Sequence, residues 1–464
     1  MNAPCCIPAF VLFVAAIAGC SASPASGGVT FDVETAGTTM GDTPPEDPDP
    51  DDEDDEGTSG GNASTGSTLD ESGDDDGGSS GGVKFDLGSD DVDLDCVPDA
   101  TDATLTGTVH APEGTIPISG ALVSFAASPP EPIPDEVYCN DCVEIDCETP
   151  HVLTEADGSF SLPVPSGTGW LVVEKGQFRR VVEIDVAPGD LALSGEQTRL
   201  PDHRDEAAGL YAPNIALGYG TWDRLEDLIA KLGLGTAVGG TFQPGGHHFD
   251  VYSRYDAAPG SVGDFHELLH DLDAMRHYHI IFFACDGDWL DAEEIANVRT
   301  WASEGGRFYA TDLEAFKVDE TFGQYQTFEH IGALLSFDWP GRVEDEGLLA
   351  WLQAQGHGEL ITLHDNASQI AALHEVLVRD EDGELVDVGH TTLLSAETAN
   401  ENAEPIGGWS PAAVMGQYGC GRVAYSTYHT TSFPHGGFEP QELTMLYLIL
   451  EIGVCQDSVG TPEG

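Results

Sequence analysis

Basic residues are scarce in this chain of 464 amino acids. Its 16 Lys and Arg stand against 82 Asp and Glu, so the formal net charge is -66. A surface of this sign repels nucleic acid and anionic lipid headgroups, so we exclude both as partners of the folded part. The segment from Ser21 to Asp95 holds only 22 of the acidic residues and one lysine. The remainder of the chain is therefore acidic in its own right.

Long apolar runs are also rare near the N-terminus, where the longest is Ile7 to Ala18. This run is too short to span a bilayer as a permanent helix and has the length of a secretory signal core. The run ends in Ile17-Ala18-Gly19-Cys20, which resembles a bacterial lipobox. The resemblance implies a signal peptide over residues 1–19, lipidation of Cys20, and a membrane anchor. With Ser21 in the next position, it implies an exported lipoprotein of the cell envelope, at the outer membrane.

Residues 20–95 lack the apolar side chains that a folded core needs. They consist largely of Gly, Ser, Thr, Pro and Asp, with an acidic block at Asp49 to Glu56. Such a segment cannot bury enough apolar area to offset its conformational entropy. We expect a disordered acidic tether that holds the folded part away from the membrane.

The ten cysteines constrain disulfide formation, which export permits. Cys5 and Cys6 leave with the signal peptide and Cys20 takes the lipid, so seven remain. Seven is odd, so at least one thiol stays unpaired, and we expect it to be Cys285 because a central strand would bury it.

The other six cysteines fall into two groups. We expect disulfides among Cys96, Cys139, Cys142 and Cys147 themselves, with a zinc site as the alternative. A final helix that returns along the preceding strand would pair Cys420 with Cys455.

Short alternating segments with turn residues follow the tether and predict an antiparallel β-sandwich over residues 96–200. The expected strands are Thr104–His110, Ala121–Ala127, Ser159–Val164, Gly169–Glu174 and Arg179–Ala187. The stretches Leu105–Val109, Ile118–Val123 and Thr154–Phe160 resemble the carboxypeptidase regulatory-like domain family. The resemblance implies a carbohydrate-binding-like fold and says little about a ligand.

The stretch His279 to Gly287 contains an unbroken apolar run from Ile280 and ends in a polar, glycine-ended turn. Such a run is typical of a strand buried on both faces. A helical stretch and a second strand, Arg307 to Thr311, follow it. Strand, helix and strand in this order predict parallel crossover units with a functional cleft at the carboxyl ends of the strands. We expect Asp286, Trp289, Asp312 and Glu314 on that rim.

Three stretches carry a further resemblance, to the class I glutamine amidotransferase-like superfamily. They are Ile280–Phe283, Gly305–Asp312 and Gly421–His429. The resemblance covers residues 208–455 and implies a flavodoxin-like α/β domain with a parallel sheet, followed by a flexible tail over residues 456–464. It also implies a catalytic cysteine on the elbow after a strand, a histidine after a late strand, and a glutamate two residues beyond.

This chain departs from that catalytic pattern. The elbow ends in Asp312 and has no cysteine, His429 matches the histidine, and Thr431 replaces the glutamate. Cys285 follows a different strand, and we expect Asp286 and Asp288 to raise its pKa. The nucleophile and the carboxylate that would orient the base are both absent, so we expect no amidotransferase activity.

Two alternatives would make the protein an enzyme. Asp312 and His429, with Asp286 nearby, could act as the acid and base of a metal-free hydrolase. Alternatively, His266-Glu267-Leu268-Leu269-His270 matches a zinc-protease motif, in which two imidazoles four residues apart bind Zn²⁺ and the glutamate activates water. The leucines belong to an ordinary buried stripe, and a recognisable third ligand is missing.

The sequence therefore predicts a multidomain exported protein. A signal peptide and a disordered acidic linker precede an antiparallel β-sandwich and an α/β amidotransferase-like domain. We expect a non-catalytic binding module without cofactor or metal, whose ligand is a carbohydrate or an envelope protein, and we retain an envelope hydrolase as the alternative.

Overall fold

The computed structural model describes residues 101–140, 149–332, 338–380, 383–400, 402, 404–430, 434–455 and 459–462. The chain divides into two units, Met1–Asp76 and Gly77–Gly464, and every described residue belongs to the second. The predicted signal peptide, the lipid anchor at Cys20, the tether and Thr431 lie outside the described residues. No helix within the described ranges is long and apolar enough to cross a bilayer.

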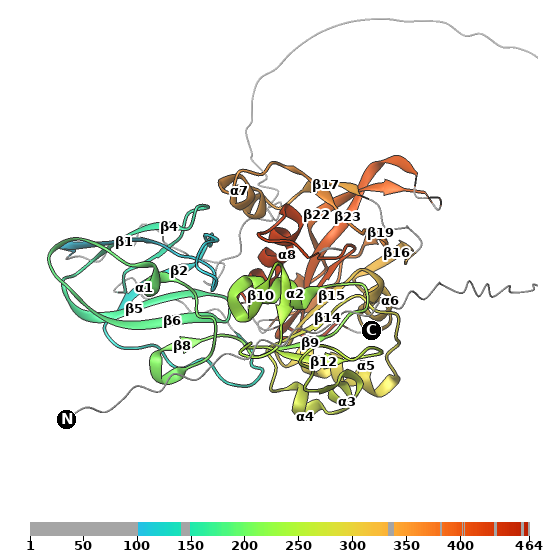
Figure 1. The fold of residues 1–464 in the computed structure, drawn as a ribbon, viewed down its shortest axis with the longest axis horizontal. Helices are drawn as coiled ribbons and strands as arrows, with labels where there is room; N and C mark the ends of the chain where they lie inside the picture. Colours follow the sequence, from blue (N-terminus) through green and yellow to red (C-terminus); the bar gives the residue numbers. More distant parts are fainter. Residues whose placement is uncertain are drawn as a thin grey trace, which may run out of the picture. The chain divides into compact units, whose positions relative to one another are not determined.

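The first folded region has two facing sheets, as the sequence predicts (Figure 1). One sheet has the order β4 (Ser159–Val164), β1 (Ala103–Thr108) and β7 (Gly189–Ala192). The other has the order β3 (His151–Leu153), β2 (Leu122–Ala126), β5 (Gly167–Lys175), β6 (Phe178–Val186) and β8 (Leu210–Tyr211). Leu105 of the first sheet and Val173 of the second are both fully buried in one shared core.

The strands of this region alternate as half-buried strands should. In β4, Phe160, Leu162 and Val164 face the core while the residues between them face solvent or lie half-buried. One pair departs from the predicted antiparallel pattern, because β1 and β7 are parallel. All other described pairs of these two sheets are antiparallel.

The second folded region is built on a sheet of ten strands (Figure 1). Its order is β13 (Gly263–Asp264), β12 (Asp250–Ser253), β9 (Ile215–Gly218), β14 (Ile280–Phe283), β15 (Arg307–Thr311), β24 (Gly421–Ser426), β23 (Pro405–Tyr418), β22 (Thr391–Ala399), β17 (Trp339–Val343) and β18 (Leu360–Leu363). The pairs from β13 to β24 are parallel, and those from β24 to β18 are antiparallel. The sheet is therefore mixed, because hairpins reverse the late strands, whereas the resemblance implies a parallel sheet.

Smaller elements complete the described chain. Three two-stranded sheets pair β10 (Thr236–Val238) with β11 (Thr241–Gln243), β16 (Gln326–His330) with β19 (Gln369–Leu373), and β20 (Leu377–Arg379) with β21 (Leu385–Asp387). The helices are α1 (Gly195–Thr198), α2 (Leu225–Ile229), α3 (Phe265–His270), α4 (Leu272–Met275), α5 (Ala292–Ser303), α6 (Ala315–Phe322), α7 (Glu346–Ala354) and α8 (Pro440–Glu451). Short helical turns are η1 (Glu206–Ala208), η2 (Ala230–Leu234) and η3 (Asp312–Glu314).

Strand β14 has the central, doubly buried position that its apolar run predicts. Ile280 and Phe282 pack in the cluster that contains α2, α7 and α8, whereas Ile281 and Phe283 pack in the cluster of α3, α4, α5 and α6. Successive side chains point to opposite faces of a strand, so an unbroken apolar run requires helices on both faces. The sheet thus forms the middle of three layers.

Local capping sets the start of three helices around the sheet. Helix α2 begins only at Leu225, four residues after Thr221. Helices α3 and α4 are separated at Asp271, whose side chain accepts a hydrogen bond from the backbone N–H of Ala274 and begins the second helix. Helix α5 has Asp291 as its N-cap, with a capping box.

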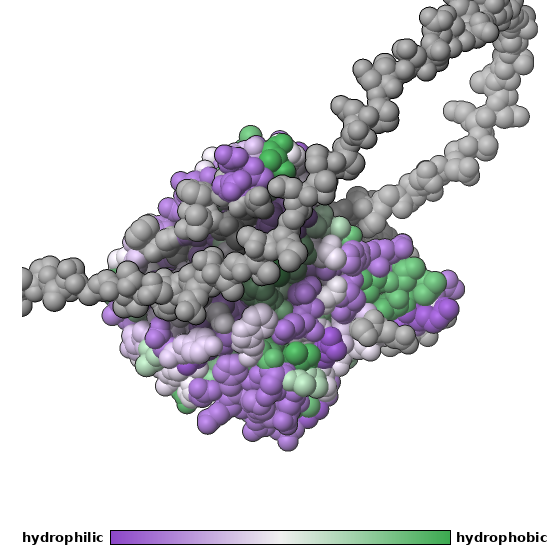
Figure 2. All heavy atoms as spheres, turned by 90° about the vertical axis from the view of Figure 1, so that its right-hand side faces the viewer, coloured by the Kyte–Doolittle hydropathy of each residue, from purple (hydrophilic) through white to green (hydrophobic). Residues whose placement is uncertain are grey.

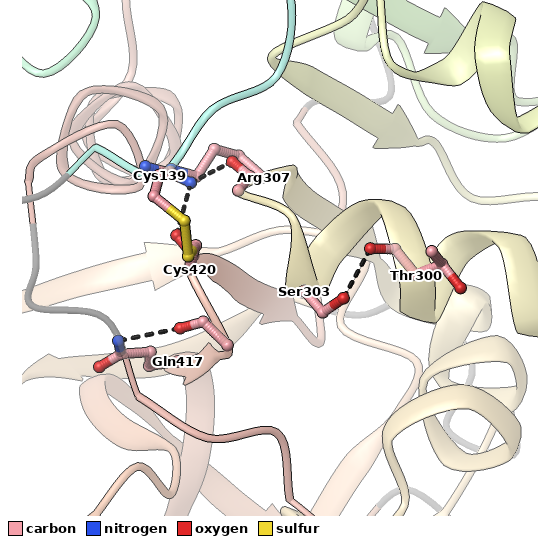
Figure 3. The surroundings of a disulfide bond; sticks show 8 residues. Cys139, Thr300, Ser303, Arg307, Gln417 and Cys420 are labelled. Atoms are coloured by element: carbon pink, nitrogen blue, oxygen red, sulfur yellow. Dashed lines mark hydrogen bonds between the residues drawn. A yellow bond between two sulfur atoms is a disulfide. The ribbon is translucent and has the colours of Figure 1, made fainter. Parts of the chain in front are cut away.

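The disulfides differ from both predicted sets. Cys139 is bonded to Cys420 (Figure 3), and Cys455 is itself disulfide-bonded. Consequently Cys420 is not the partner of Cys455, and Cys139 neither pairs within the upstream group nor binds zinc. Cys96, Cys142 and Cys147 lie outside the described residues. The predicted unpaired thiol is confirmed, because Cys285 is free and buried.

The physical reason for this pairing is a loop of the β-sandwich region that docks on the α/β region. The backbone N–H of Val137 donates to the carbonyl of Arg276 at 2.8 Å. A Cβ at Gly305 would lie 2.0 Å from the carbonyl oxygen of Tyr138, so only a glycine admits the loop there. This docking carries Cys139 to the turn between β23 and β24.

Candidate functional site

Three neighbouring strands of the sheet place their carboxyl ends at one point. Strand β15 lies between β14 and β24 and runs parallel to both. Cys285 follows β14, Asp312 follows β15 directly, and His429 follows β24. The carboxyl ends of these strands therefore bring Asp312 and His429 together, and they also bring in Cys285, which the sequence assigns to a different strand.

Asp312 occupies the sharp strand-to-helix turn that the sequence predicts. Its φ is +44°, a backbone conformation uncommon for any residue other than glycine, and η3 begins at this residue. The hydroxyl of Tyr425 donates to the Asp312 carbonyl at 2.7 Å, and the hydroxyl of Ser368 donates to Oδ1 at 3.2 Å. A neighbouring strand, through Tyr425, and a loop, through Ser368, thus hold the turn in its strained form.

The three side chains are close together and enclosed. Oδ2 of Asp312 lies 2.8 Å from Nε2 of His429 and 3.8 Å from Sγ of Cys285. Cys285 is 0% exposed, Asp312 1% and His429 8%. The proximity of Asp312 and His429 that the hydrolase alternative requires is present.

Burial and mutual charge set the protonation of this group. Burial raises the pKa of Asp312, against the opposing contact with His429. Burial would lower the pKa of His429, but the carboxylates of Asp312, Asp223 and Asp365 outweigh it and raise that pKa to about 9. Burial, then the charge of Asp312, raises the pKa of the Cys285 thiol strongly. At neutral pH the thiol is neutral and the imidazole is protonated, so the group offers neither a thiolate nor a free base.

A second carboxylate, Asp223, forms hydrogen bonds with residues next to Asp312 and His429. Thr311 donates through Oγ1 to Oδ2 of Asp223 at 2.6 Å, and the backbone N–H of Thr430 donates to Oδ1 at 3.0 Å. The backbone N–H of Cys285 in turn donates to Oγ1 of Thr311 at 3.0 Å. Sequence reasoning missed Asp223 and Ser368, since both come from loops far away in the chain and belong to no recognisable motif.

The other two acidic residues of the predicted rim, Asp286 and Glu314, point into the protein. Together with Asp288 they are buried around the guanidinium of Arg254, which comes from the segment after β12. Nε of Arg254 lies 2.9 Å from Asp288, and Nη2 lies 3.0 Å from Glu314. Asp286 is therefore a member of an internal charge network, and the cause of the raised Cys285 pKa is burial and Asp312, not Asp286 or Asp288.

The two histidines of the zinc-protease motif are each paired with carboxylates. Nδ1 of His266 lies 2.6 Å from Glu294 and its Nε2 lies 3.0 Å from Asp288. Nε2 of His270 lies 2.9 Å from Asp291, and Glu267 is exposed to solvent. Each imidazole thus contacts carboxylates from the turn after β14 or from the start of α5. These contacts account for both histidines without a zinc ion.

Three aromatic side chains lie along the turn that follows Cys285, and we refer to Trp222, Trp289 and Phe316 as the aromatic rim. Trp222 is 52% exposed and Trp289 58%. A Cβ on the exposed Gly287 would lie 3.6 Å from the ring of Trp222, and the ring of Trp289 lies 5.0 Å from that of Phe316. Trp289 is the member of the predicted rim that solvent reaches.

Comparisons with known proteins find structural likeness without sequence relatives. No family model matches the chain, and no curated protein matches it. A ThuA-like protein from Parabacteroides merdae is 11% identical, with a TM-score of 0.32 over 53% of this chain and 96% of that chain. Two cytoplasmic proteins from Salmonella typhimurium are 10% and 12% identical, each with a TM-score of 0.30. They cover 51% and 52% of this chain and 98% and 99% of their own.

Proposed function

We propose that this chain is an exported, lipid-anchored protein of the cell envelope whose amidotransferase-like domain binds a carbohydrate without transforming it. Cys20 is the proposed point of lipidation, and residues 20–95 the proposed tether. The carboxyl edge of the ten-stranded sheet is the proposed binding face, with the aromatic rim as its contact surface. The observation that carries the proposal is the exposure of Trp222 and Trp289 beside a closed Asp312–His429 pair.

The closed pair supports binding in preference to catalysis. Oδ2 of Asp312 contacts His429, Oδ1 accepts a hydrogen bond from Ser368, and the residue is 1% exposed. A carboxylate that has a close partner at each oxygen and is excluded from solvent is poorly placed to attack a substrate or to take its proton. The imidazole of His429, protonated at neutral pH, lies against the same carboxylate and offers no free base.

The aromatic rim supports a carbohydrate ligand. Exposed tryptophans cost free energy in water, and two of them beside one turn indicate a contact surface. The flat face of a pyranose ring presents C–H groups that pack on an indole, while its hydroxyls bond to polar groups around it. Figure 2 shows one face of the molecule, which is mainly hydrophilic and on which hydrophobic residues gather in separate groups.

The test is titration of the full chain with maltohexaose, cellohexaose and chitohexaose by calorimetry. We expect binding of at least one of them and a loss of at least about tenfold in affinity for Trp222→Ala and for Trp289→Ala. Trp409→Ala is the matched control, because Trp409 is also exposed but lies on β23 against Arg342. Binding of none of the three sugars, or an equal loss in the control, would contradict the proposal.

A metal-free hydrolase is the second candidate, because Asp312 combines a strained elbow conformation with a histidine at 2.8 Å. Turnover of an ester, amide or glycoside that disappears in Asp312→Asn would favour it. The binding proposal expects no turnover by the wild-type protein and unchanged sugar affinity in Asp312→Asn.

A further inference from the structure

Cys285, Asp312 and His429 bring one sulfur, one oxygen and one nitrogen together inside the α/β region. Their ligand atoms all lie within 4.8 Å of one another, and all three residues are buried. Among the described residues, this is the one group of three or more Cys, His, Asp and Glu side chains whose ligand atoms lie this close together. We propose that the three residues bind one divalent cation of borderline softness, with Zn²⁺ as the best-fitting ion. The inference goes beyond the proposed function and does not depend on it.

The observed distances are close to those of a zinc site. Zinc lies about 2.3 Å from a thiolate and about 2.0–2.2 Å from an imidazole nitrogen or a carboxylate oxygen, so tetrahedral ligand atoms lie roughly 3.3–3.7 Å apart. Oδ2 of Asp312 lies 2.8 Å from Nε2 of His429 and 3.8 Å from Sγ of Cys285. Side-chain shifts of less than about 1 Å would admit the ion. Three protein ligands leave a fourth position for water, as in zinc sites with an open position.

Independently of these distances, Nε2 of His429 is a buried nitrogen with no hydrogen bond of suitable geometry among the described residues, although a carboxylate oxygen lies 2.8 Å away. The side chain is 10% exposed, so water does not readily reach it. A buried polar atom without a directed partner needs an explanation. A cation between the nitrogen and the carboxylate would replace the ring proton and give this nitrogen a directed partner.

Charge and ligand type select the ion. A thiolate and a carboxylate balance the two positive charges, so the loaded site is neutral and its burial costs little. Binding releases the thiol proton of Cys285 and the imidazolium proton of His429 to solvent. Calcium and magnesium prefer oxygen ligands, whereas a mixed S, N and O set suits zinc or cobalt.

Hydrogen bonds around the site already orient two of the ligands. Ser368 binds Oδ1 of Asp312, which leaves Oδ2 for the ion. Thr311 accepts from the backbone N–H of Cys285 and donates to Asp223, which fixes the strand end that carries the sulfur. Such second-layer contacts commonly accompany metal ligands.

The experiment uses the full chain, stripped with a chelator and then titrated with Co²⁺ and, separately, with Zn²⁺. We expect one equivalent of Co²⁺ to give a thiolate-to-cobalt charge-transfer band, and one equivalent of Zn²⁺ to abolish it. Cys285→Ala should lose the band, and both it and His429→Gln should lose at least about 100-fold in zinc affinity, more than the loss typical of an outer-layer contact. His266→Gln is the matched control and should behave as the wild type.

The cobalt band separates this site from weak binding to the acidic surface, because a sulfur ligand is required for the band. A wild-type protein that takes up no stoichiometric metal would overturn the inference, and so would a metal stoichiometry that is unchanged in Cys285→Ala. The wild-type spectrum decides the matter even if a variant fails to fold. Sugar binding is measured separately, so the two proposals can fail independently.

Discussion

A disulfide joins Cys139, in a loop of the β-sandwich region, to Cys420, at the turn between β23 and β24 (Figure 3). The two cysteines are 281 residues apart in sequence. Nη1 of Arg307, at the start of β15, donates to the Cys420 carbonyl at 3.1 Å. The disulfide therefore links the β-sandwich region to the central strands of the α/β region.

The first prediction concerns this disulfide. Replacing both cysteines, Cys139→Ala with Cys420→Ala, should lower the free energy of unfolding by about 2–5 kcal/mol, because the unfolded chain regains the freedom that a long closed loop removes. Denaturation by guanidinium, compared with the wild type, measures the loss. Mass spectrometry of the unreduced digest is the control and should show a peptide containing both residues. A peptide that links Cys420 to Cys455 would contradict the structure.

The second prediction concerns the pair of Asp312 and His429 in chelator-treated protein. Asp312→Asn and His429→Gln should each destabilise the fold by about 3–5 kcal/mol, because each leaves a buried group without its partner. The double variant should cost less than the sum of the two by about 0.5–3 kcal/mol. Urea denaturation of the four proteins gives the coupling, and strict additivity would show that the 2.8 Å contact carries no energy.

The third prediction concerns pH. Burial, then the charge of Asp227, raises the pKa of Glu226 to about 8. In the unfolded chain a glutamate titrates near 4.3, so between these values the folded state holds a proton that the unfolded state has lost. The stability that protonated Glu226 contributes is therefore full below about pH 4.3 and is lost as the pH rises from there to about 8.

Glu226→Gln should remove this part of the pH dependence, since glutamine cannot ionise. Between pH 6 and pH 9 we expect the wild type to lose about 2 kcal/mol more than the variant, measured by denaturation at each pH. Glu183→Gln is the matched control, because Glu183 is exposed on β6. His429, with a pKa of about 9, contributes in the same direction and leaves a residual slope in both variants. Equal slopes for Glu226→Gln and the wild type would contradict the prediction.

The sequence predicts best where one local pattern has one structural solution. The apolar run at Ile280–Phe283 fits a doubly buried strand, and the structure has it at the centre of the sheet. The sequence also predicts a strand-to-helix turn at Asp312, and the positive φ of this residue confirms it. The unpaired state of Cys285 followed from an odd count and a buried strand, and it is confirmed as well.

Prediction from the sequence fails where contacts join segments that are distant in the chain. Cys139 stands near other cysteines in the chain, yet docking of its loop brings it to Cys420. Asp286 follows a strand end like Asp312, but it lies beside Arg254, which comes from the segment after β12. Strand β23 is long and mixes Gly, Ser and Pro with apolar residues, so its full length and its pairing with β22 cannot be derived from periodicity.

The last prediction concerns Arg254, whose side chain is fully buried between Asp288 and Glu314. Arg254→Met should lower the free energy of unfolding by about 3–5 kcal/mol, because the buried carboxylates of Asp288 and Glu314 lose a shared partner. Lys317 and His266 remain as their other contacts. Arg276→Met is the matched control: Arg276 pairs with Glu304 at the surface, and its loss should cost only about 0–1 kcal/mol.

The same substitution should also weaken sugar binding, because Asp288 directly precedes Trp289 of the aromatic rim and fixes its turn. We expect the affinity of Arg254→Met to fall at least about fivefold at a temperature where the variant remains folded by circular dichroism. Lys317→Met provides a second comparison, since Nζ of Lys317 lies 2.5 Å from Asp288 and should give a smaller effect in the same direction. An Arg254→Met variant as stable as Arg276→Met would mean that the buried charges are not what holds this turn.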